Sequence, residues 1–108
     1  MTVTTLGRVN VATPGTLIQL STDLTLRVAK LFFQVIPGLT GKVYFGKAGM
    51  TRSTLAGVIR VLAPNASSGV SDSFFLEASD GADSINLASY WIDADVAGEG
   101  LLISYWTE

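Results

Sequence analysis

The sequence predicts an all-β protein, folded as a single-domain β-sandwich over residues 1–108. Three observations lead to this prediction. Apolar residues recur with a period of two, and clusters of Gly, Pro, Asn, Asp and Ser interrupt the apolar runs at short intervals. No stretch long enough for a helix is free of Gly or β-branched residues. A chain of 108 residues can also bury a core without disulfides or metal ions to hold it.

The first predicted strand covers residues 2–12, with Val9 and Val11 on one face. A turn at Thr13-Pro-Gly15 separates it from a short strand at residues 16–20. Both strands therefore present an apolar face to the predicted core.

Residues 24–36 form the longest apolar segment, and the apolar residues change parity within it. Two sets lie on opposite parities: Leu24, Leu26 and Val28, followed by Leu31, Phe33 and Val35. A parity change moves the apolar set to the opposite face of a sheet unless an extra residue absorbs it. We therefore predict a β-bulge, or a crossing from one sheet to the other, near residues 28–30.

Shorter strands complete the prediction, at residues 42–45, 54–63, 72–78, 85–87, 90–92 and 101–106. Leu55, Ile59 and Val61 are in phase in the segment 54–63, and Phe74 and Leu76 are in phase in the segment 72–78. About eight strands in one domain predict a jelly roll. A Greek-key sandwich of the immunoglobulin type is the alternative, although the Cys and Trp spacing of that fold is absent.

Two aromatic pairs, Tyr90-Trp91 and Tyr105-Trp106, lie in predicted strands. Because neighbouring side chains of a strand point to opposite faces, one aromatic residue of each pair is expected inside and one outside. An outward tryptophan would serve as an interface anchor or as a platform for a sugar. We expect at least one of the two tryptophans in the core, since an aromatic side chain buries a large apolar area.

The composition excludes most kinds of enzyme, because the chain contains no histidine and no cysteine. These absences exclude a Ser-His-Asp triad, a cysteine nucleophile, a thiolate metal site and disulfides. No phosphate-binding glycine loop, dinucleotide fingerprint or nucleophile-elbow motif is present either. We therefore predict a protein that is not an enzyme and needs no cofactor.

Positive and negative charges are segregated along the chain. The first 60 residues carry all seven bases and one acid, a formal charge of +6, whereas the remainder carries eight acids and no base, a charge of −8. The opposite charges meet either as pairs within one chain or between neighbouring copies, and we expect a homo-oligomer. Only 15% of the residues are charged, against about 25% in typical soluble chains, so considerable apolar surface is left for a partner.

Nucleic acid and membranes are not expected partners. Few aromatic residues interleave the basic ones, and the sequence pI of about 4.9 opposes binding to phosphates. The N-terminal residues lack the pattern of a signal peptide, and no segment reaches the roughly 18 apolar residues that a membrane span requires.

Four loop aspartates are the candidates for a metal site, because Ca²⁺ binds about six to eight oxygens and carboxylates supply them. They are Asp80, Asp83, Asp93 and Asp95. The ligand order of an EF-hand is absent, and the ordinary alternative is an acidic turn whose aspartates bond their own backbone. We therefore expect no bound metal.

Three segments carry a resemblance: Gly41-Lys-Val-Tyr-Phe-Gly46, Ser71-Asp-Ser-Phe-Phe-Leu76, and Tyr90-Trp-Ile-Asp-Ala-Asp-Val-Ala-Gly-Glu-Gly100 leading into Leu101-Leu-Ile-Ser-Tyr-Trp106. With them the chain resembles the auxiliary virion proteins of tailed bacteriophages, of the head decoration (cement) or head-fibre type. The resemblance implies a virion protein, made in the host cytoplasm, that binds the major capsid protein and stabilises the shell. A tail or baseplate component and a carbohydrate-binding module are the alternatives.

The contacts with other virion proteins are expected at charged residues of the first strand and of the loops. These residues are Arg8, Lys47, Arg52, Asp83, Asp95 and Glu99.

Overall fold

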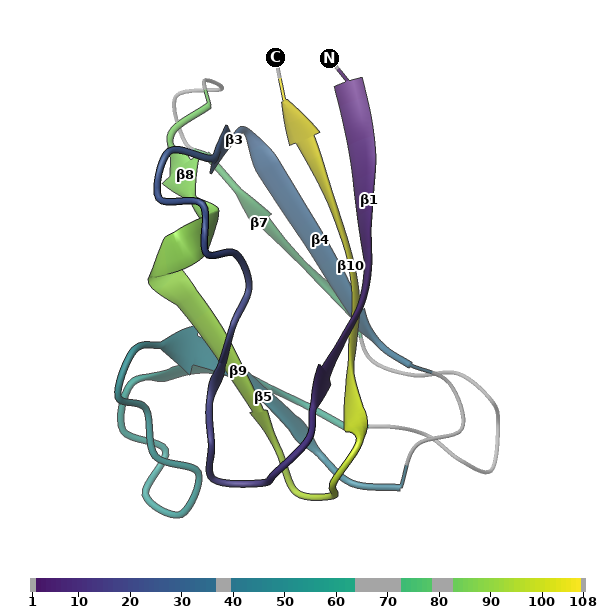
Figure 1. Ribbon diagram of the computed structural model, residues 1–108, viewed down its shortest axis with the longest axis vertical. Coiled ribbons are helices and arrows are strands. Elements are labelled where there is room, and N and C mark those ends of the chain that lie inside the picture. Colours follow the sequence, from purple (N-terminus) through teal and green to yellow (C-terminus); the bar gives the residue numbers. More distant parts are fainter. Residues whose placement is uncertain (1, 37–39, 64–72, 79–82, 108) are drawn as a thin grey trace.

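The computed structural model describes residues 2–36, 40–63, 73–78 and 83–107, and within these ranges the protein is all-β (Figure 1). The strands are β1 (Thr2–Val11), β2 (Ile18–Gln19), β3 (Arg27–Val28), β4 (Lys30–Val35), β5 (Val43–Lys47), β6 (Val58–Leu62), β7 (Ser73–Glu77), β8 (Ile85–Asn86), β9 (Tyr90–Ala94) and β10 (Glu99–Thr107). One 3-10 turn, η1 (Leu87–Ser89), lies between β8 and β9. None of the described residues forms an α-helix, and so none lies in a helix that could cross a membrane.

The strands form two four-stranded antiparallel sheets and one small pair. Sheet A has the order β1-β10-β4-β7, sheet B has the order β2-β9-β5-β6, and β3 pairs with β8. Most connections cross from one sheet to another, whereas β5 and β6 are consecutive and pair directly. The all-β prediction is confirmed, and the strand order places residues far apart in the sequence side by side.

The core lies between sheets A and B because both sheets turn an apolar face inward. On β4, Leu31, Phe33 and Val35 are fully buried, while the residues between them are only half-buried. Phe33 stacks on Phe45 of β5, with ring centroids 4.2 Å apart, and this contact joins the two sheets. Each such fully buried side chain contributes about 1.5–3 kcal/mol to the stability.

The predicted crossing near residues 28–30 is confirmed. Arg27 and Val28 pair with β8, whereas Lys30 begins β4 in sheet A, so the chain changes sheets at Ala29. Val28 packs in a second small cluster with Ala78 and Ile85, apart from the main core. The parity change in the sequence therefore marks a change of partner strand and not an error in the alternation.

The segment 54–63 differs from the prediction. Its strand is shorter, and the residues in phase there point away from the core, with Leu55 and Ile59 both exposed. The fully buried residue is Leu62, which has the opposite parity and pairs with Val43. Arg60 shares that inward parity and places its guanidinium over the ring of Phe74, 4.6 Å from the centroid. The guanidinium of Arg60 therefore lies on the core side of the strand, where the prediction had placed Ile59 and Val61.

The expectation of a tryptophan in the core is wrong. The alternation is as predicted, but the inward member of each pair is the tyrosine: Tyr90 stacks on Phe45, and Tyr105 packs against the core. Trp91 and Trp106 are both half-buried and lie outside the buried core. The tyrosine hydroxyls can reach the rim of the core, which makes tyrosine compatible with partial burial.

Candidate functional site

The outer face of sheet B is covered in part by the chain itself, over β5 and β9. Residues 47–57, between β5 and β6, lie over this face, and Met50 is buried there. A Cβ on Gly46 would lie 2.7 Å from the Sδ of Met50 and 2.5 Å from the carbonyl oxygen of Gly57. Such a close approach is open only to glycine, so Gly46 is the residue that lets the loop pack onto the sheet.

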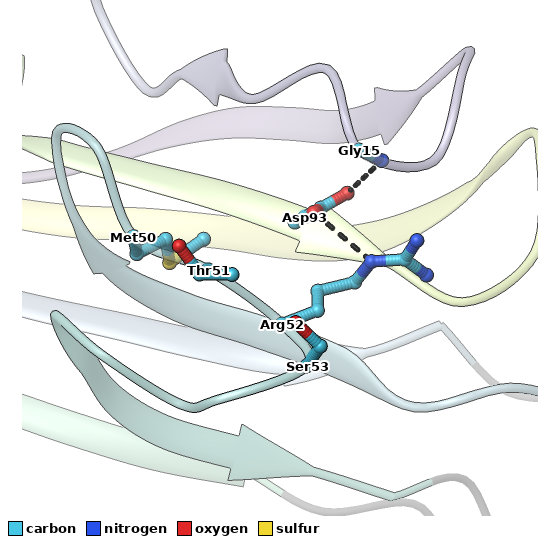
Figure 2. Close-up of a pocket in the computed structure, with 6 residues that line it drawn as sticks. All are labelled: Gly15, Met50, Thr51, Arg52, Ser53 and Asp93. Atoms are coloured by element: carbon cyan, nitrogen blue, oxygen red, sulfur yellow. Dashed lines mark hydrogen bonds and ion pairs between the residues drawn. The ribbon is translucent and has the colours of Figure 1, made fainter.

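Arg52 of this loop forms an ion pair with Asp93 of β9 (Figure 2), with its Nε 3.2 Å from Oδ2. The other carboxylate oxygen of Asp93 accepts hydrogen bonds from the backbone N–H of Gly15, at 3.0 Å, and of Ala94, at 2.8 Å. Asp93 is 2% exposed, so its charge is stable in the interior only because these donors surround it. The pair ties the covering loop and the turn after β1 to the middle of sheet B.

Asp95 extends the same cluster into solvent. The Nη1 of Arg52 donates to Oδ1 of Asp95 at 3.1 Å and to the carbonyl oxygen of Ala94 at 2.9 Å. The hydroxyl of Tyr44 donates to Oδ2 of Asp95 at 3.3 Å. Burial raises the pKa of Tyr44 above its ordinary value, and the hydrogen bond to Asp95 raises it further.

A hollow of about 260 Å³ lies beside this cluster, lined by Gly15, Met50, Thr51, Arg52, Ser53 and Asp93 (Figure 2). Its charged groups are the two members of the ion pair, and both are already bonded to protein groups. The hydroxyls of Thr51 and Ser53 have no histidine to activate them, since the chain contains none. The cluster therefore uses both of its charged groups to hold the loop in place.

The structure brings two of the four predicted metal candidates together. Asp93 and Asp95 both form ion pairs with Arg52, so the cation between these two carboxylates is the guanidinium of Arg52. Asp83 is exposed just before β8, and Asp80 lies outside the described residues. Within the described part of the chain, no three carboxylate, His or Cys groups come together in a way that could hold a metal ion.

The residues expected to contact partners are spread over the molecule. Arg8 is exposed on the outer side of β1, and Lys47 is exposed at the end of β5. Glu99 is buried at the start of β10, where its carboxylate accepts hydrogen bonds from the N–H groups of Thr40 and Gly41 at 3.1 and 2.9 Å. This carboxylate is used inside the molecule to join the start of β10 to the segment before β5, which sequence reasoning missed.

The outer face of sheet A has no cover from the described residues, and we call it the open face. Alternate residues of its four strands point outward in three rows, which the register of the sheet defines. The rows are Val3–Trp106–Lys30–Glu77, Thr5–Ser104–Phe32–Phe75 and Arg8–Leu102–Gln34–Ser73. Val3 is 55% exposed on β1, at one edge of this face, and Phe75 is 49% exposed on β7, at the other edge.

Three aromatic side chains form a ridge on the β4–β7 side of the open face. The ring of Phe75 lies 4.7 Å from that of Phe32 and 6.4 Å from that of Trp106. The ammonium of Lys30 lies over two of these rings, 4.3 Å from the centroid of Phe75 and 5.5 Å from that of Trp106. Cation–π contacts of this kind are worth about 0.5–1 kcal/mol at exposed sites.

A second hollow, also of about 260 Å³ and mostly apolar, lies beside this ridge over β10. It is lined by Thr5, Gly7, Phe32, Gln34, Leu102, Ile103 and Ser104. The register between β1 and β10 shifts between Thr5 and Gly7, and Gly7 has a φ of 87°. A β-bulge of this kind bends the edge strand, and small residues on both sides leave the hollow open.

Sequence reasoning missed this open face, although a signal for it exists. Phe32-Phe33 and Phe74-Phe75 are two doublets of aromatic residues in strands. Each doublet must place one ring on the outer face, because neighbours in a strand alternate. The pairing of β4 with β7 then brings the outward rings, Phe32 and Phe75, together.

The comparisons with known proteins give no relative. No family model matches this chain, and neither does a curated protein or a solved structure.

Proposed function

We propose that this protein is a structural component of a phage virion, a decoration or cement protein that binds the major capsid protein and stabilises the shell. The observation that carries the proposal is the open face: a whole sheet surface with exposed Val3, Phe75 and Leu102 and no cover from the described residues. Exposed apolar surface of this extent is typical of proteins that are buried against partners. The opposite charges of the two halves add attraction between copies or to the shell.

The proposed topology is a jelly-roll β-sandwich. In a jelly roll, eight strands form two facing four-stranded sheets, and most connections cross from one sheet to the other. If the two-residue strands β3 and β8 are set aside, the orders β1-β10-β4-β7 and β2-β9-β5-β6 follow that scheme. Jelly rolls are common in viral capsid proteins and in lectins, and this agrees with the proposed class by analogy of fold.

The proposed mechanism is binding at many equivalent sites. Each bound copy bridges neighbouring shell subunits, and contacts of modest affinity add up when one copy touches several subunits. We expect the shell contacts at exposed charges of β1 and of the loops, Arg8, Lys47, Asp83 and Asp95, with Arg52 and Glu99 positioning the loops around them. A tail or baseplate component would use the same contacts at another place in the virion.

The experiment is to purify particles of the phage that encodes this chain and to quantify the chain against the major capsid protein by mass spectrometry. The proposal predicts a fixed ratio that falls after a wash at high salt, since the contacts are partly ionic. Purified protein added back should restore the ratio at low salt. A chain missing from the particles, or encoded far from any head or tail gene, would contradict the proposal.

A carbohydrate-binding module remains the second candidate, because Trp91 and Trp106 are both half-buried and outside the core. Sugars that bind a tryptophan face change its fluorescence, so titration with a panel of glycans tests this candidate directly. The position of Lys30 over the rings of Phe75 and Trp106 opposes it on the open face, because a sugar would need the same ring faces. The sharper prediction is therefore that Trp91→Ala, and not Trp106→Ala, abolishes any sugar response.

A further inference from the structure

We infer that the lateral edge of β1 binds a second copy of this chain, so that the two β1 strands pair antiparallel and join both copies of sheet A into one sheet of eight strands. The surface concerned is the side of residues 2–6 that faces away from β10, and we call it the free edge. It is separate from the open face, which stays available to other partners. The inference rests on β1 itself and does not depend on the proposed function.

The edge strands of the two sheets differ in how they are protected against pairing with other strands. Proteins keep edge strands short, place charges on them or cover them. In sheet B, β2 has two residues, and β6 has five with Arg60 in the middle. At the far edge of sheet A, β7 has five residues and ends with Glu77. β1 has ten residues, and its first charged residue is Arg8, so residues 2–6 have neither kind of protection.

The free edge is open in the structure. Residues 2–6 are exposed at every position, and within the described ranges β10 is the only strand that pairs with β1 (Figure 1). Every second N–H and C=O group of an antiparallel edge strand points away from its neighbour, so the free edge presents a row of backbone donors and acceptors. Its side chains are three threonines, a valine and a leucine, and threonine and valine favour strands. The segment is therefore suited to pair with another strand.

A second β1 fits this edge because antiparallel pairing about a two-fold axis is complementary to itself. With the axis beside Thr4, this residue lies opposite its own equivalent in the other copy, and Val3 lies opposite Thr5. The pairing uses all of residues 2–6. It ends at Gly7, where the β-bulge and a φ of 87° bend the strand.

The same register covers the two exposed apolar side chains of the free edge. Val3 is 55% exposed and Leu6 is 36% exposed. Val3 gains Thr5 of the other copy directly opposite on the same face of the sheet, with Cβ atoms about 4.5–5.5 Å apart. Leu6, at the start of the bulge, lies beside Thr2 of the other copy. Thr5 also lines the apolar hollow over β10, so Val3 of one copy extends the wall of the hollow of the other.

The charges of β1 favour this antiparallel register over a parallel one. Residues 2–6 carry no charge, so no like charges meet within the paired segment. The two copies of Arg8 lie about eight positions apart along the joined strands, about 26 Å at about 3.3 Å per residue, where salt screens their repulsion. Parallel pairing in register would set Arg8 beside Arg8, which is unfavourable. Among the described strands each copy has one such unprotected edge, so the pairing stops at two copies.

Charges introduced at the centre of the pairing test the inference. Thr4→Lys sets two ammonium groups opposite each other across the two-fold axis, and Thr4→Glu sets two carboxylates there. Either variant alone is expected to raise the dissociation constant of the dimer, measured by analytical ultracentrifugation, by about fivefold or more. An equal mixture of the two variants brings lysine opposite glutamate and should restore a constant within about twofold of wild type.

Ile59→Lys is the matched control. Ile59 is an exposed residue of β6, which is also an edge strand, but of sheet B. Its substitution adds the same charge away from the free edge and should change the dissociation constant by less than about twofold. Urea unfolding of Thr4→Lys and Ile59→Lys checks that both variants fold, which is expected because both side chains are exposed.

Disulfide formation tests the register, and the absence of native cysteine makes it specific. Thr4→Cys places two cysteines opposite each other with Cα atoms about 4.5–5.5 Å apart, within the range of a disulfide. Thr5→Cys places them about two positions apart along the strands, with Cα atoms about 8 Å apart, beyond that range. In a glutathione redox buffer, Thr4→Cys should therefore form a covalent dimer, and Thr5→Cys should stay largely unlinked.

The outcomes separate this inference from the proposed function. A dimer that each charged variant weakens, that their mixture restores and that Thr4→Cys links supports the inference. A wild-type monomer at every concentration, a dimer insensitive to Thr4→Lys, or equal linking of the two cysteine variants overturns it. A monomer whose binding to phage particles is lost in Thr4→Lys also overturns it, assigns the free edge to a strand of another virion protein and leaves the proposed function standing. A dimer that never associates with particles does the reverse.

Discussion

The outer faces of the two sheets differ in how far the chain itself covers them. On sheet B, residues 47–57 pack onto the surface, Met50 is buried over Gly46, and Arg52 forms ion pairs with two aspartates. On sheet A, the described chain supplies no such cover, and Phe75 and Val3 stay about half-exposed. One face is therefore partly closed by intramolecular contacts, while the other keeps apolar side chains exposed.

This difference separates the contacts that serve the fold from the surface that we propose for assembly. The polar cluster on sheet B has the residue types that often mark an active site, yet its charged groups are bonded to each other and to the backbone. The open face instead has the exposed aromatic residues that interfaces favour. Substitutions on sheet B should thus lower stability, and substitutions on the open face should lower association.

The largest loss of stability is expected from Asp93→Ala. This change leaves Arg52 with only part of its contacts and deprives the N–H groups of Gly15 and Ala94 of their acceptor. We expect a loss of about 3 kcal/mol, at the lower end for a broken buried pair because Arg52 is partly exposed. Urea unfolding measures it.

Asp95→Ala is the matched control, since Asp95 pairs with the same Arg52 at nearly the same distance but its side chain is 38% exposed, against 3% for Asp93. The expected loss is about 1 kcal/mol or less. Equal losses for the two variants would show that sheet B is not closed by a buried ion pair.

Gly46→Ala is expected to lift the covering loop. The new Cβ meets the backbone oxygen of Gly57, which cannot move away as a flexible side chain would. Overpacking of this kind costs about 2 kcal/mol. Trypsin should then cut faster after Arg52, and an unchanged cleavage rate would contradict the role assigned to this glycine.

Tyr44→Phe isolates the part of the pH dependence of stability that comes from the hydroxyl of Tyr44 in the sheet B cluster. Because the folded state raises the pKa of Tyr44, the folded protein holds this proton more tightly than the unfolded chain does. The contribution of this pKa shift to the free energy of unfolding is complete below the unfolded pKa of Tyr44, about 10. It is lost as the pH rises through the pKa that Tyr44 has in the folded state. Wild type is expected to exceed the variant by about 1 kcal/mol at neutral pH through the bond to Asp95.

The measurement for Tyr44 is urea unfolding of both proteins between about pH 8 and 11. The difference between wild type and variant should shrink only at the alkaline end. A difference that stays constant over the range would show that the hydroxyl is not buried in the folded protein.

The smallest loss of stability is expected from Phe75→Ser on the open face. The ring is half-exposed and its contacts are with neighbours on the same surface, so the monomer should lose about 0.5 kcal/mol. Urea unfolding of wild type and variant measures this value. A loss as large as that of Asp93→Ala would mean that the ridge belongs to the fold and would remove the contrast between the two faces.

Local patterns predicted the parts of the fold that depend on neighbouring residues. The change of sheet at Ala29 follows from a parity change, and the inward positions of Phe74 and Leu76 follow from simple alternation. The strand 58–62 was misjudged because it lies at the edge of sheet B, where a cation over Phe74 takes an inward position. Whether a strand lies at an edge depends on the strand order of the whole sheet, and the alternation of apolar residues in the sequence does not indicate it.

The polar contacts were beyond prediction for a similar reason. Arg52 and Asp93 lie on different elements, and Glu99 reaches the backbone of Thr40 and Gly41 across the fold. Their charges were visible in the sequence, but which base meets which acid depends on the strand order. The segregation of charges did indicate that bases of the first half would meet acids of the second, and the pairs of Arg52 with Asp93 and Asp95 are of this kind.

The register of β1 with β10 sets Thr2 directly opposite Thr107, and both ends of the ribbon emerge at the same margin of the molecule (Figure 1). A short peptide linker could therefore join them and convert the chain into a ring or a circular permutant without disturbing the sheet. Closing that gap should stiffen the two strands that frame the hollow. It would also let cargo fused at either end project side by side, which makes this margin a natural attachment point for display.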